Sequence, residues 1–205
     1  MLTVSHLACT RGERRLFSAL DFEVDRGECV HVQGENGSGK TSLLRIVSGL
    51  AHAAEGQVLW NGEDTRKLGE AWHAELLFIG HHHAVKEELT ARENVMLAAL
   101  LDGHALPDVT LQSALSRMGL RGREDLPVRY LSQGQKRRVA LTRLLTRRAR
   151  LWLLDEPFTA LDTAAVELVG GLITEHLAGR GSVLLTSHQP LSLPGGHVRT
   201  LRLGG

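Results

Sequence analysis

Cysteine, long apolar runs and aromatic side chains are all scarce in this chain of 205 residues. The two cysteines, Cys9 and Cys29, exclude a disulfide framework and favour a reducing compartment. No apolar run approaches the roughly 20 residues that cross a bilayer, and the first residues lack the basic and then apolar pattern of a signal peptide. We therefore expect a soluble intracellular protein that meets a membrane only through a partner.

An excess of charge of one sign is also lacking, since 24 Lys and Arg residues against 23 Asp and Glu residues leave a formal charge of +1. This balance is not typical of proteins that coat nucleic acid, so any basic surface must be local. Hydrophobic residues make up 42% of the sequence, which is enough for a sizeable core. The length fits one domain, or one domain with a small lobe attached.

Apolar periodicity predicts an alternation of strands and helices over most of the chain. Strands are expected at residues 2–8, 16–24, 28–34, 56–62, 75–80, 151–155, 182–188 and 197–205. Helices are expected at residues 43–49, 91–100, 111–118, 131–145 and 164–177. Strands separated by helices of this length favour a mainly parallel sheet with right-handed crossovers, so the predicted fold class is α/β.

A glycine-rich loop that can hold phosphate follows the strand at residues 28–34. Residues 34–41 read GENGSGKT, a complete G-x-x-x-x-G-K-[ST] motif between an apolar strand and a helix. Glycines let backbone N–H groups surround a polyphosphate, and the helix directs its positive end at the same anion. A plain glycine-rich turn is the alternative. The residues expected to bind nucleotide here are Gly34, Glu35, Asn36, Gly37, Ser38, Gly39, Lys40, Thr41 and Ser42.

Two carboxylates end the apolar run at residues 151–154. Asp155 and Glu156 would lie at the carboxyl end of a buried parallel strand, where open α/β sheets bind their ligands. We expect Thr41 to ligate Mg²⁺ and Asp155 to hold the ion through water. Glu156 is then placed to orient, or take a proton from, the water that attacks the γ-phosphate. A solvated pair at the start of a turn is the alternative.

A second motif, LSQGQ, precedes a predicted helix. Ser132 and Gln135 have the spacing of a capping box, but capping does not explain Gly134, which costs a helix about 1 kcal/mol unless something approaches closely. A hydroxyl, a bare backbone and a helix N-terminus together form a second surface suited to phosphate.

The order of these motifs resembles the ATP-binding subunits of ABC transporters, which are P-loop ATPases. LSQGQ is similar to their LSGGQ signature, Asp162 matches the D-loop aspartate, and His188 in LLTSH matches the switch histidine. The resemblance implies one ATPase domain over residues 1–205, with an N-terminal antiparallel β subdomain and a helical lobe and signature helix at about 86–148. It also implies that two copies pair head to tail on binding ATP, each completing the other's site.

The sequence departs from this family at two places. Most members carry a glutamine after the strand at residues 75–80, where it senses Mg²⁺ and couples to the membrane subunit; here the match is His82, which lacks the amide's paired donor and acceptor. An aromatic side chain that stacks on adenine is also missing, and Arg11 could stack there instead.

Within the family, residues 80–95 (GHHHAVKEELTARENV) and the segment LWLLDEPFTALD are similar to the ATP-binding subunit of the cytochrome c maturation haem exporter. That likeness implies an ATPase that drives haem export or releases a haem-loaded chaperone. It would lie on the cytoplasmic side of a bacterial inner membrane and bind a separate permease subunit, with further cytochrome c maturation subunits as additional partners.

Other functions remain open from the residues alone. Eight basic residues between Arg129 and Arg150, with no acidic one among them, could mark an ABC ATPase that acts on nucleic acid, although a solvated helix face is favoured and we expect no nucleic-acid partner. Another small exporter, a small-molecule kinase and a haem-binding module built on His81–His83 are the remaining alternatives.

Overall fold

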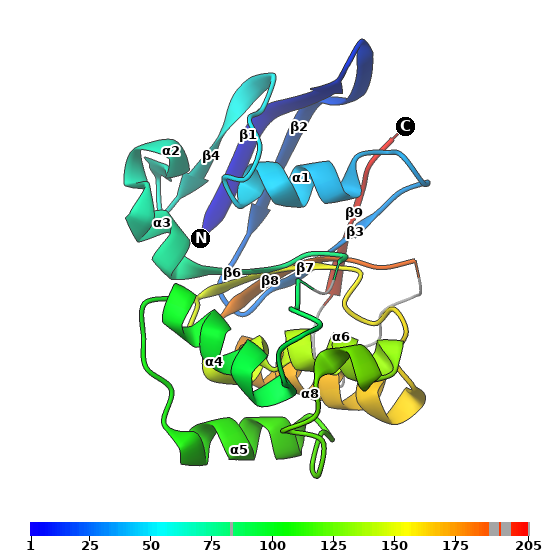
Figure 1. The fold of residues 1–205 in the computed structure, drawn as a ribbon. Coiled ribbons are helices and arrows are strands. Elements are labelled where there is room, and N and C mark those ends of the chain that lie inside the picture. Colours follow the sequence, from blue (N-terminus) through cyan, green and yellow to red (C-terminus); the bar gives the residue numbers. More distant parts are fainter. Residues whose placement is uncertain (83, 189–192, 194–197, 205) are drawn as a thin grey trace. The chain divides into compact units, whose positions relative to one another are not determined.

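The computed structural model describes residues 1–82, 84–188, 193 and 198–204. The chain forms two compact units. Unit 1 comprises Met1–Phe78, Ala149–Glu156 and Ile173–Gly205, and unit 2 comprises Ile79–Arg148 and Pro157–Leu172. Strands and helices alternate as predicted (Figure 1), and the α/β fold class is confirmed.

Unit 1 contains the antiparallel sheet predicted for the N-terminal part of the chain. Its strands are β1 (Leu2–Arg11), β2 (Arg14–Val24), β4 (Glu55–Trp60) and β5 (Glu63–Asp64), in the order β2-β1-β4-β5. Val4 pairs with Phe22 on one side and with Val58 on the other, and all three side chains are buried. Alternating apolar residues on these strands thereby give the sheet one buried face.

A second sheet carries the strands that lead into the predicted site. Its order is β6-β7-β8-β3-β9, from β6 (Leu76–Ile79), β7 (Leu151–Asp155), β8 (Ser182–Thr186), β3 (Cys29–Gln33) and β9 (Val198–Arg202). β3 is parallel to β8 and β9, and β7 is parallel to β8. Every residue of β7 and β8 is buried, as expected for parallel strands covered on both faces. The carboxyl ends of β3, β7 and β8 therefore meet at one edge.

Helix α1 (Lys40–Val47) lies between the two sheets of unit 1 (Figure 1), and its apolar residues join the main hydrophobic core. Two short helices that the periodicity did not predict, α2 (Thr65–Leu68) and α3 (Glu70–Glu75), follow β5. The indole of Trp72 is 1% exposed and donates to the Val47 carbonyl at 3.1 Å. This bond satisfies an orphan carbonyl at the end of α1.

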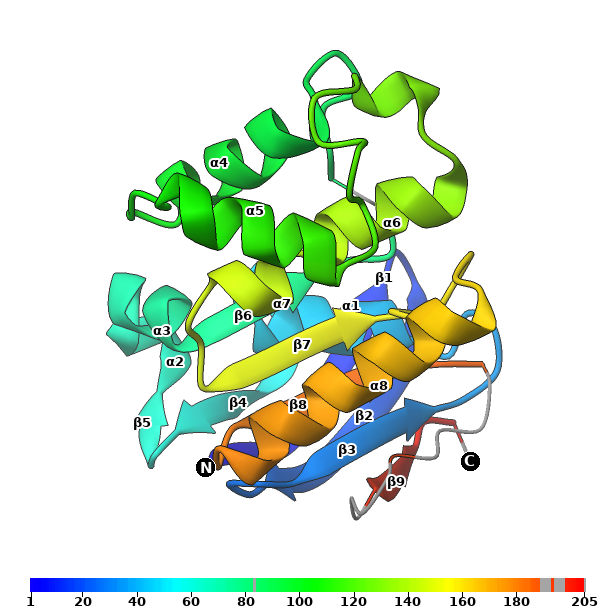
Figure 2. The ribbon, with the colours of Figure 1, turned by 90° about the horizontal axis from the view of Figure 1, so that it is seen from below.

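Unit 2 is helical. It contains α4 (Ala91–Leu101), α5 (Asp108–Arg117), the 3-10 turn η1 (Val128–Tyr130), α6 (Gln133–Leu141), α7 (Arg143–Thr146) and the first part of α8 (Thr163–Ala178). Figure 2 shows α4 and α5 side by side, with α6 and α7 next to them. Capping boxes begin α4 at Thr90 and α6 at Ser132, and the second confirms the spacing of Ser132 and Gln135.

The helix predicted at 131–145 is wrong in two respects. It begins at Gln133, because Leu131 and Ser132 are extended, and it is divided at Thr142 into α6 and α7. The Thr142 hydroxyl donates to the Arg138 carbonyl at 2.9 Å. A hydroxyl that bonds back onto the preceding turn competes with the helix ladder and bends it.

Candidate functional site

The phosphate loop requires glycine at several of its positions. Gly37 and Gly39 have φ values of +83° and +102°, in the left-handed region that side chains disfavour. A Cβ at Gly34 would lie 2.5 Å from the Ser38 hydroxyl and 2.7 Å from the Leu203 carbonyl oxygen. The loop is thus held tightly between β3 and the residue that follows β9.

Lys40 is folded back across this loop. Its side chain is buried, and Nζ donates to the carbonyl oxygens of Gly34 at 2.7 Å and Glu35 at 3.1 Å. The ammonium group therefore lies beside the first residues of the loop. A phosphate bound in the loop would offer it a charged acceptor, which binds more strongly than neutral carbonyls.

Asp155, 1% exposed at the end of β7, links the loop to the sheet. One carboxylate oxygen accepts from the Thr41 hydroxyl at 2.8 Å, and the other accepts from the Thr186 hydroxyl at 2.8 Å. A carboxylate and a hydroxyl so close together are hard oxygen donors of the kind that Mg²⁺ prefers. The donor set fits the predicted magnesium site.

Glu156 turns away from β7 in a left-handed conformation, with a φ of +50°. Its backbone N–H donates to the Thr186 hydroxyl at 2.9 Å. The His188 backbone N–H donates to Glu156 Oε2 at 3.2 Å, and His188 Nε2 lies 3.4 Å from Oε1. The structure therefore brings Glu156 and His188, 32 positions apart, into direct contact.

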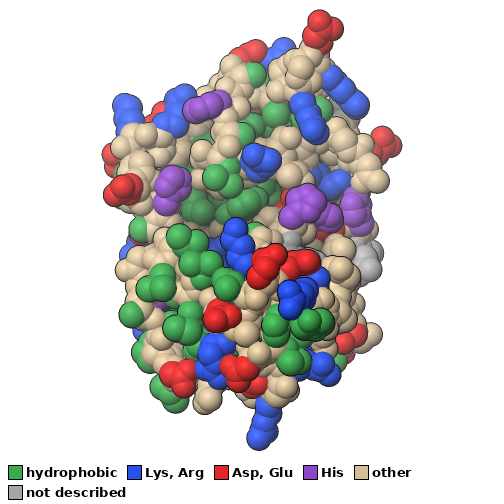
Figure 3. All heavy atoms as spheres, viewed as in Figure 1, with side chains coloured by type: hydrophobic (Ala, Val, Ile, Leu, Met, Phe, Trp, Pro, Cys, Tyr) green, Lys and Arg blue, Asp and Glu red, His purple; other side chains and the backbone are tan. Residues whose placement is uncertain are grey.

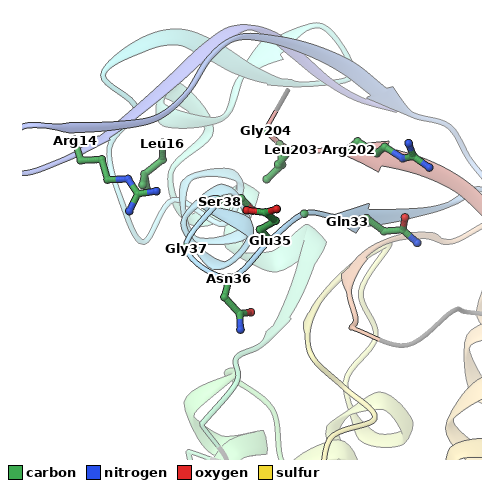
Figure 4. A pocket seen from close by; sticks show the side chains of 11 residues that line it. Arg14, Leu16, Gln33, Glu35, Asn36, Gly37, Ser38, Arg202, Leu203 and Gly204 are labelled. Carbon is green, nitrogen blue, oxygen red and sulfur yellow. The ribbon is translucent and has the colours of Figure 1, made fainter.

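A pocket of about 580 Å³ lies along the phosphate loop (Figure 4). Besides loop residues 34–38, its lining includes Arg14 and Leu16 from β2, Gln33 from β3, and residues 202–204. Arg11, the residue predicted to stack on a base, does not line this pocket; Arg14, its cross-strand partner, does. Sequence reasoning missed Arg14 and Leu16 because no local motif marks them.

The signature residues Ser132 and Gln135 form a reciprocal capping box at the start of α6 in unit 2. The Gln135 N–H donates to Ser132 Oγ at 3.2 Å, and the Ser132 N–H donates to Gln135 Oε1 at 2.9 Å. A Cβ at Gly134 would lie 2.6 Å from the Ala160 carbonyl oxygen. Gly134 therefore has a packing reason inside unit 2, in addition to the predicted approach of a ligand.

Asp162 also lies in unit 2, at the start of α8, where its carboxylate accepts from the Ala165 N–H at 2.8 Å. The predicted D-loop aspartate thus caps a helix.

Histidines 81 and 82 are exposed, and their rings meet edge to face with centroids 5.6 Å apart. His83 lies outside the described residues. Within the described ranges, no group of three or more His, Cys, Asp or Glu residues gathers as metal ligands would. Arg137 fixes the backbone before them, donating from Nη1 to the Gly80 carbonyl at 2.9 Å.

Part of the basic stretch from Arg129 to Arg150 forms ion pairs within unit 2. Lys136 pairs with Glu87 at 2.6 Å, and both Arg143 and Arg147 pair with Asp102. On the face shown in Figure 3, basic and acidic side chains are interspersed. Lys136, Arg143 and Arg147 are therefore engaged in contacts within unit 2.

Comparison with known proteins places these features in context. A profile described as "ABC transporter" matches residues 17–159. A "Cytochrome c biogenesis ATP-binding export protein CcmA" from Dechloromonas aromatica is 50% identical over 204 residues, which cover 100% of both chains. The protein of the same name from Nitrosomonas europaea is 51% identical over 191 residues, covering 93% of this chain and 90% of that one.

Solved structures share the fold. A putative ABC transporter ATP-binding protein from Pyrococcus furiosus has a TM-score of 0.85 at 24% identity, covering 98% of this chain and 96% of that one. A dimeric post-hydrolysis structure of the ATP-binding cassette MJ0796 with ADP and phosphate has a TM-score of 0.83 at 24% identity, covering 99% of this chain and 94% of that one.

In the described part of the chain, no helix is long and apolar enough to cross a membrane.

Proposed function

The chain belongs to the ABC transporter family of ATP-binding domains, and we propose that its hydrolysis of ATP drives an export step in the assembly of c-type cytochromes. The full-length identity to export proteins of cytochrome c biogenesis supports this assignment. The observation that carries the chemistry is the meeting of the phosphate loop, Asp155, Glu156 and His188 at one edge of the parallel sheet. The exported species is haem, or the ATPase releases a haem-loaded chaperone.

In this proposal, the loop residues Gly34–Thr41 and Ser42 hold the phosphates of ATP. Backbone N–H groups of the loop and the N-terminus of α1 face the anion, and Lys40 exchanges its two carbonyl contacts for the β- and γ-phosphates. Arg14 and Leu16 extend this surface along the pocket and offer contacts to the rest of the nucleotide.

Thr41 and Asp155 would hold Mg²⁺, which neutralises charge on the phosphoryl group being transferred. The 2.8 Å hydrogen bond between them keeps both oxygens at one point before the ion arrives. Asp155 is also fixed from its other side by Thr186, so its carboxylate has little freedom to turn.

Glu156 would orient the attacking water and accept its proton. Its carboxylate is 11% exposed and is held by the His188 backbone, while the His188 ring, 58% exposed, faces it. A positioned general base of this kind contributes about 10²–10⁴-fold to a rate. His188 then steadies the carboxylate and reaches toward the γ-phosphate.

A second copy of the chain would complete each site with Ser132, Gly134, Gln135 and Asp162. The N-terminus of α6 and the bare backbone at Gly134 suit a phosphate approaching from that copy. His82 would take the place of the family's glutamine, which senses Mg²⁺ and couples to the membrane subunit.

The membrane partner is an integral permease subunit on the inner membrane of a bacterium, and the ATPase lies on its cytoplasmic side. Further cytochrome c maturation subunits would join the same assembly. The ion pairs of Lys136, Arg143 and Arg147 support a function without nucleic acid.

The test is Glu156→Gln, which removes the base but keeps the side chain's size. We expect the variant to bind ATP like the wild type, to hydrolyse it at least about 100-fold more slowly, and to accumulate as an ATP-bound dimer in size-exclusion chromatography with light scattering. Turnover equal to that of the wild type would remove Glu156 from this role.

The trapped variant also tests the partner. We expect it to co-purify from detergent-solubilised membranes with one integral protein, and strains that carry it to lack covalently attached haem in c-type cytochromes by peroxidase staining. Normal haem attachment would contradict the role in cytochrome c biogenesis while leaving the ATPase assignment intact.

A further inference from the structure

Thr186 is a buried side chain at the junction of the two acidic residues. It ends β8, is 0% exposed, and pairs in register with Asp155 at the end of β7. Its hydroxyl donates to Asp155 Oδ1 at 2.8 Å and accepts from the Glu156 N–H at 2.9 Å. A hydroxyl can donate one hydrogen bond and accept others, so the Thr186 hydroxyl joins Asp155, the last residue of β7, to Glu156, the residue that follows it.

The backbone that Thr186 holds is strained. Glu156 has a φ of +50°, a conformation that non-glycine residues seldom adopt and that persists only when the surroundings enforce it. Pro157 follows and disfavours the α region at Glu156. The bond to the Thr186 hydroxyl is thus one of the contacts that keep the Glu156 peptide in this turn.

His188, two residues beyond Thr186, also holds the Glu156 carboxylate. The His188 N–H donates to Oε2 at 3.2 Å. Two contacts therefore fix Glu156: the Thr186 side chain at the end of β8 holds its backbone, and the His188 backbone just after β8 holds its side chain. Removal of the first contact lets the peptide relax and turns the carboxylate away from the second.

We propose that Thr186 is a positioning residue for ATP hydrolysis, which acts through Glu156 by holding its backbone in the left-handed turn. The inference rests on the proposed role of Glu156 as the residue that orients the attacking water. Thr186 itself does not touch the nucleotide in this scheme. A displaced base costs turnover without weakening ATP binding, because Lys40 and the loop backbone that would hold the phosphates are unchanged.

The experiment compares Thr186→Val with Thr186→Ser. Valine keeps the shape and removes the hydroxyl, whereas serine keeps the hydroxyl and removes a methyl group. We expect Thr186→Val to lower kcat by about 10–100-fold while KM for ATP stays within about twofold, and Thr186→Ser to stay within about threefold of the wild type in both. Circular dichroism and calorimetric ATP affinity confirm that each variant is folded.

Several results would overturn the inference. Full turnover in Thr186→Val would do so, and so would an equal loss in Thr186→Ser, which would point to packing. If excess Mg²⁺ restored the turnover of Thr186→Val, the hydroxyl would act by positioning Asp155 instead of Glu156. Should the valine variant not fold, Thr186→Cys, with a weaker donor and acceptor of similar size, takes its place and is expected to lose turnover to an intermediate degree.

The Glu156→Gln background separates this inference from the proposed function. If Thr186 acts through Glu156, adding Thr186→Val to Glu156→Gln causes little further loss, whereas independent effects would multiply. Undiminished hydrolysis by Glu156→Gln refutes the proposed role of Glu156, on which the inference rests. If Glu156→Gln hydrolyses ATP slowly while Thr186→Val keeps the turnover of the wild type, only the role of Thr186 is refuted.

Discussion

Substituting Gly181 by alanine tests how unit 1 supports the strand that carries Asp155. Trp152 on β7 stacks on His176 near the end of α8, with ring centroids 3.9 Å apart and planes inclined by 6°. A Cβ at Gly181 would lie 2.2 Å from both Cε1 and Nε2 of the His176 ring and 2.6 Å from Cδ2. The φ of Gly181 lies outside the left-handed region, so the backbone conformation does not exclude alanine, whereas the close contact with the ring opposes it.

The magnitude follows from this contact. Since the imidazole is stacked on Trp152, it cannot move in that direction, and overpacking of such a site costs about 1–3 kcal/mol. Alanine recovers about 0.4–1 kcal/mol by restricting the unfolded chain. With three ring atoms in contact, we expect an overpacking cost in the upper part of this range, about 2–3 kcal/mol. Gly181→Ala should then lower the free energy of unfolding by about 1–2.5 kcal/mol, or Tm by about 2–10 °C for a chain of this length.

The assay is thermal and urea unfolding followed by circular dichroism, with two reference variants. Gly171→Ala in α8 places a Cβ with nothing within 4 Å and should be neutral or stabilising by up to about 1 kcal/mol. In a His176→Ala background the ring is gone, so Gly181→Ala should cost little, and the double-mutant cycle should show positive coupling. Unchanged stability of Gly181→Ala, or a cost that persists without the ring, would refute the reasoning.

Two further predictions concern charged groups. Burial lowers the pKa of His176 below its usual value of about 6.5, so the folded protein binds this proton less readily than the unfolded chain. The free energy of unfolding should therefore fall as the pH decreases below about 6.5. His176→Phe should reduce this dependence in urea titrations from pH 8 to pH 5. Lys40→Ala should weaken ATP binding by about 10–100-fold in calorimetry, because the phosphates lose a charged donor. The matched control is Lys67→Ala on α2, and equal ATP affinities of the two variants would contradict the role of Lys40.

The local motifs of the site could be predicted because their geometry depends on a few consecutive residues. The glycines of residues 34–39 dictate the loop, and the apolar run that ends at Asp155 dictates a buried strand with acids at its end. The capping box at Ser132 needs only four consecutive residues, and it forms. The structure bears out these features as local geometry, and the roles assigned to their residues stay predictions.

Contacts between distant segments could not be predicted. Thr186 meets Asp155 and Glu156 across 31 and 30 positions, because β8 happens to lie beside β7. His31 Nε2 lies 3.1 Å from the Ser187 carbonyl oxygen, 156 positions away, because β3 lies on the other side of β8. No periodicity or motif in either segment indicates its neighbour.

The sequence by itself thus determined the α/β class, the phosphate loop and the two acids, since backbone conformation and burial follow from nearby residue types. Only the tertiary structure decided what holds these groups in place. The order β6-β7-β8-β3-β9 selects which hydroxyl and which backbone N–H reach Glu156, and the packing of Ala160 on Gly134 selects where a side chain would not fit. Strand order depends on the summed packing of the whole core, which no short window of sequence contains.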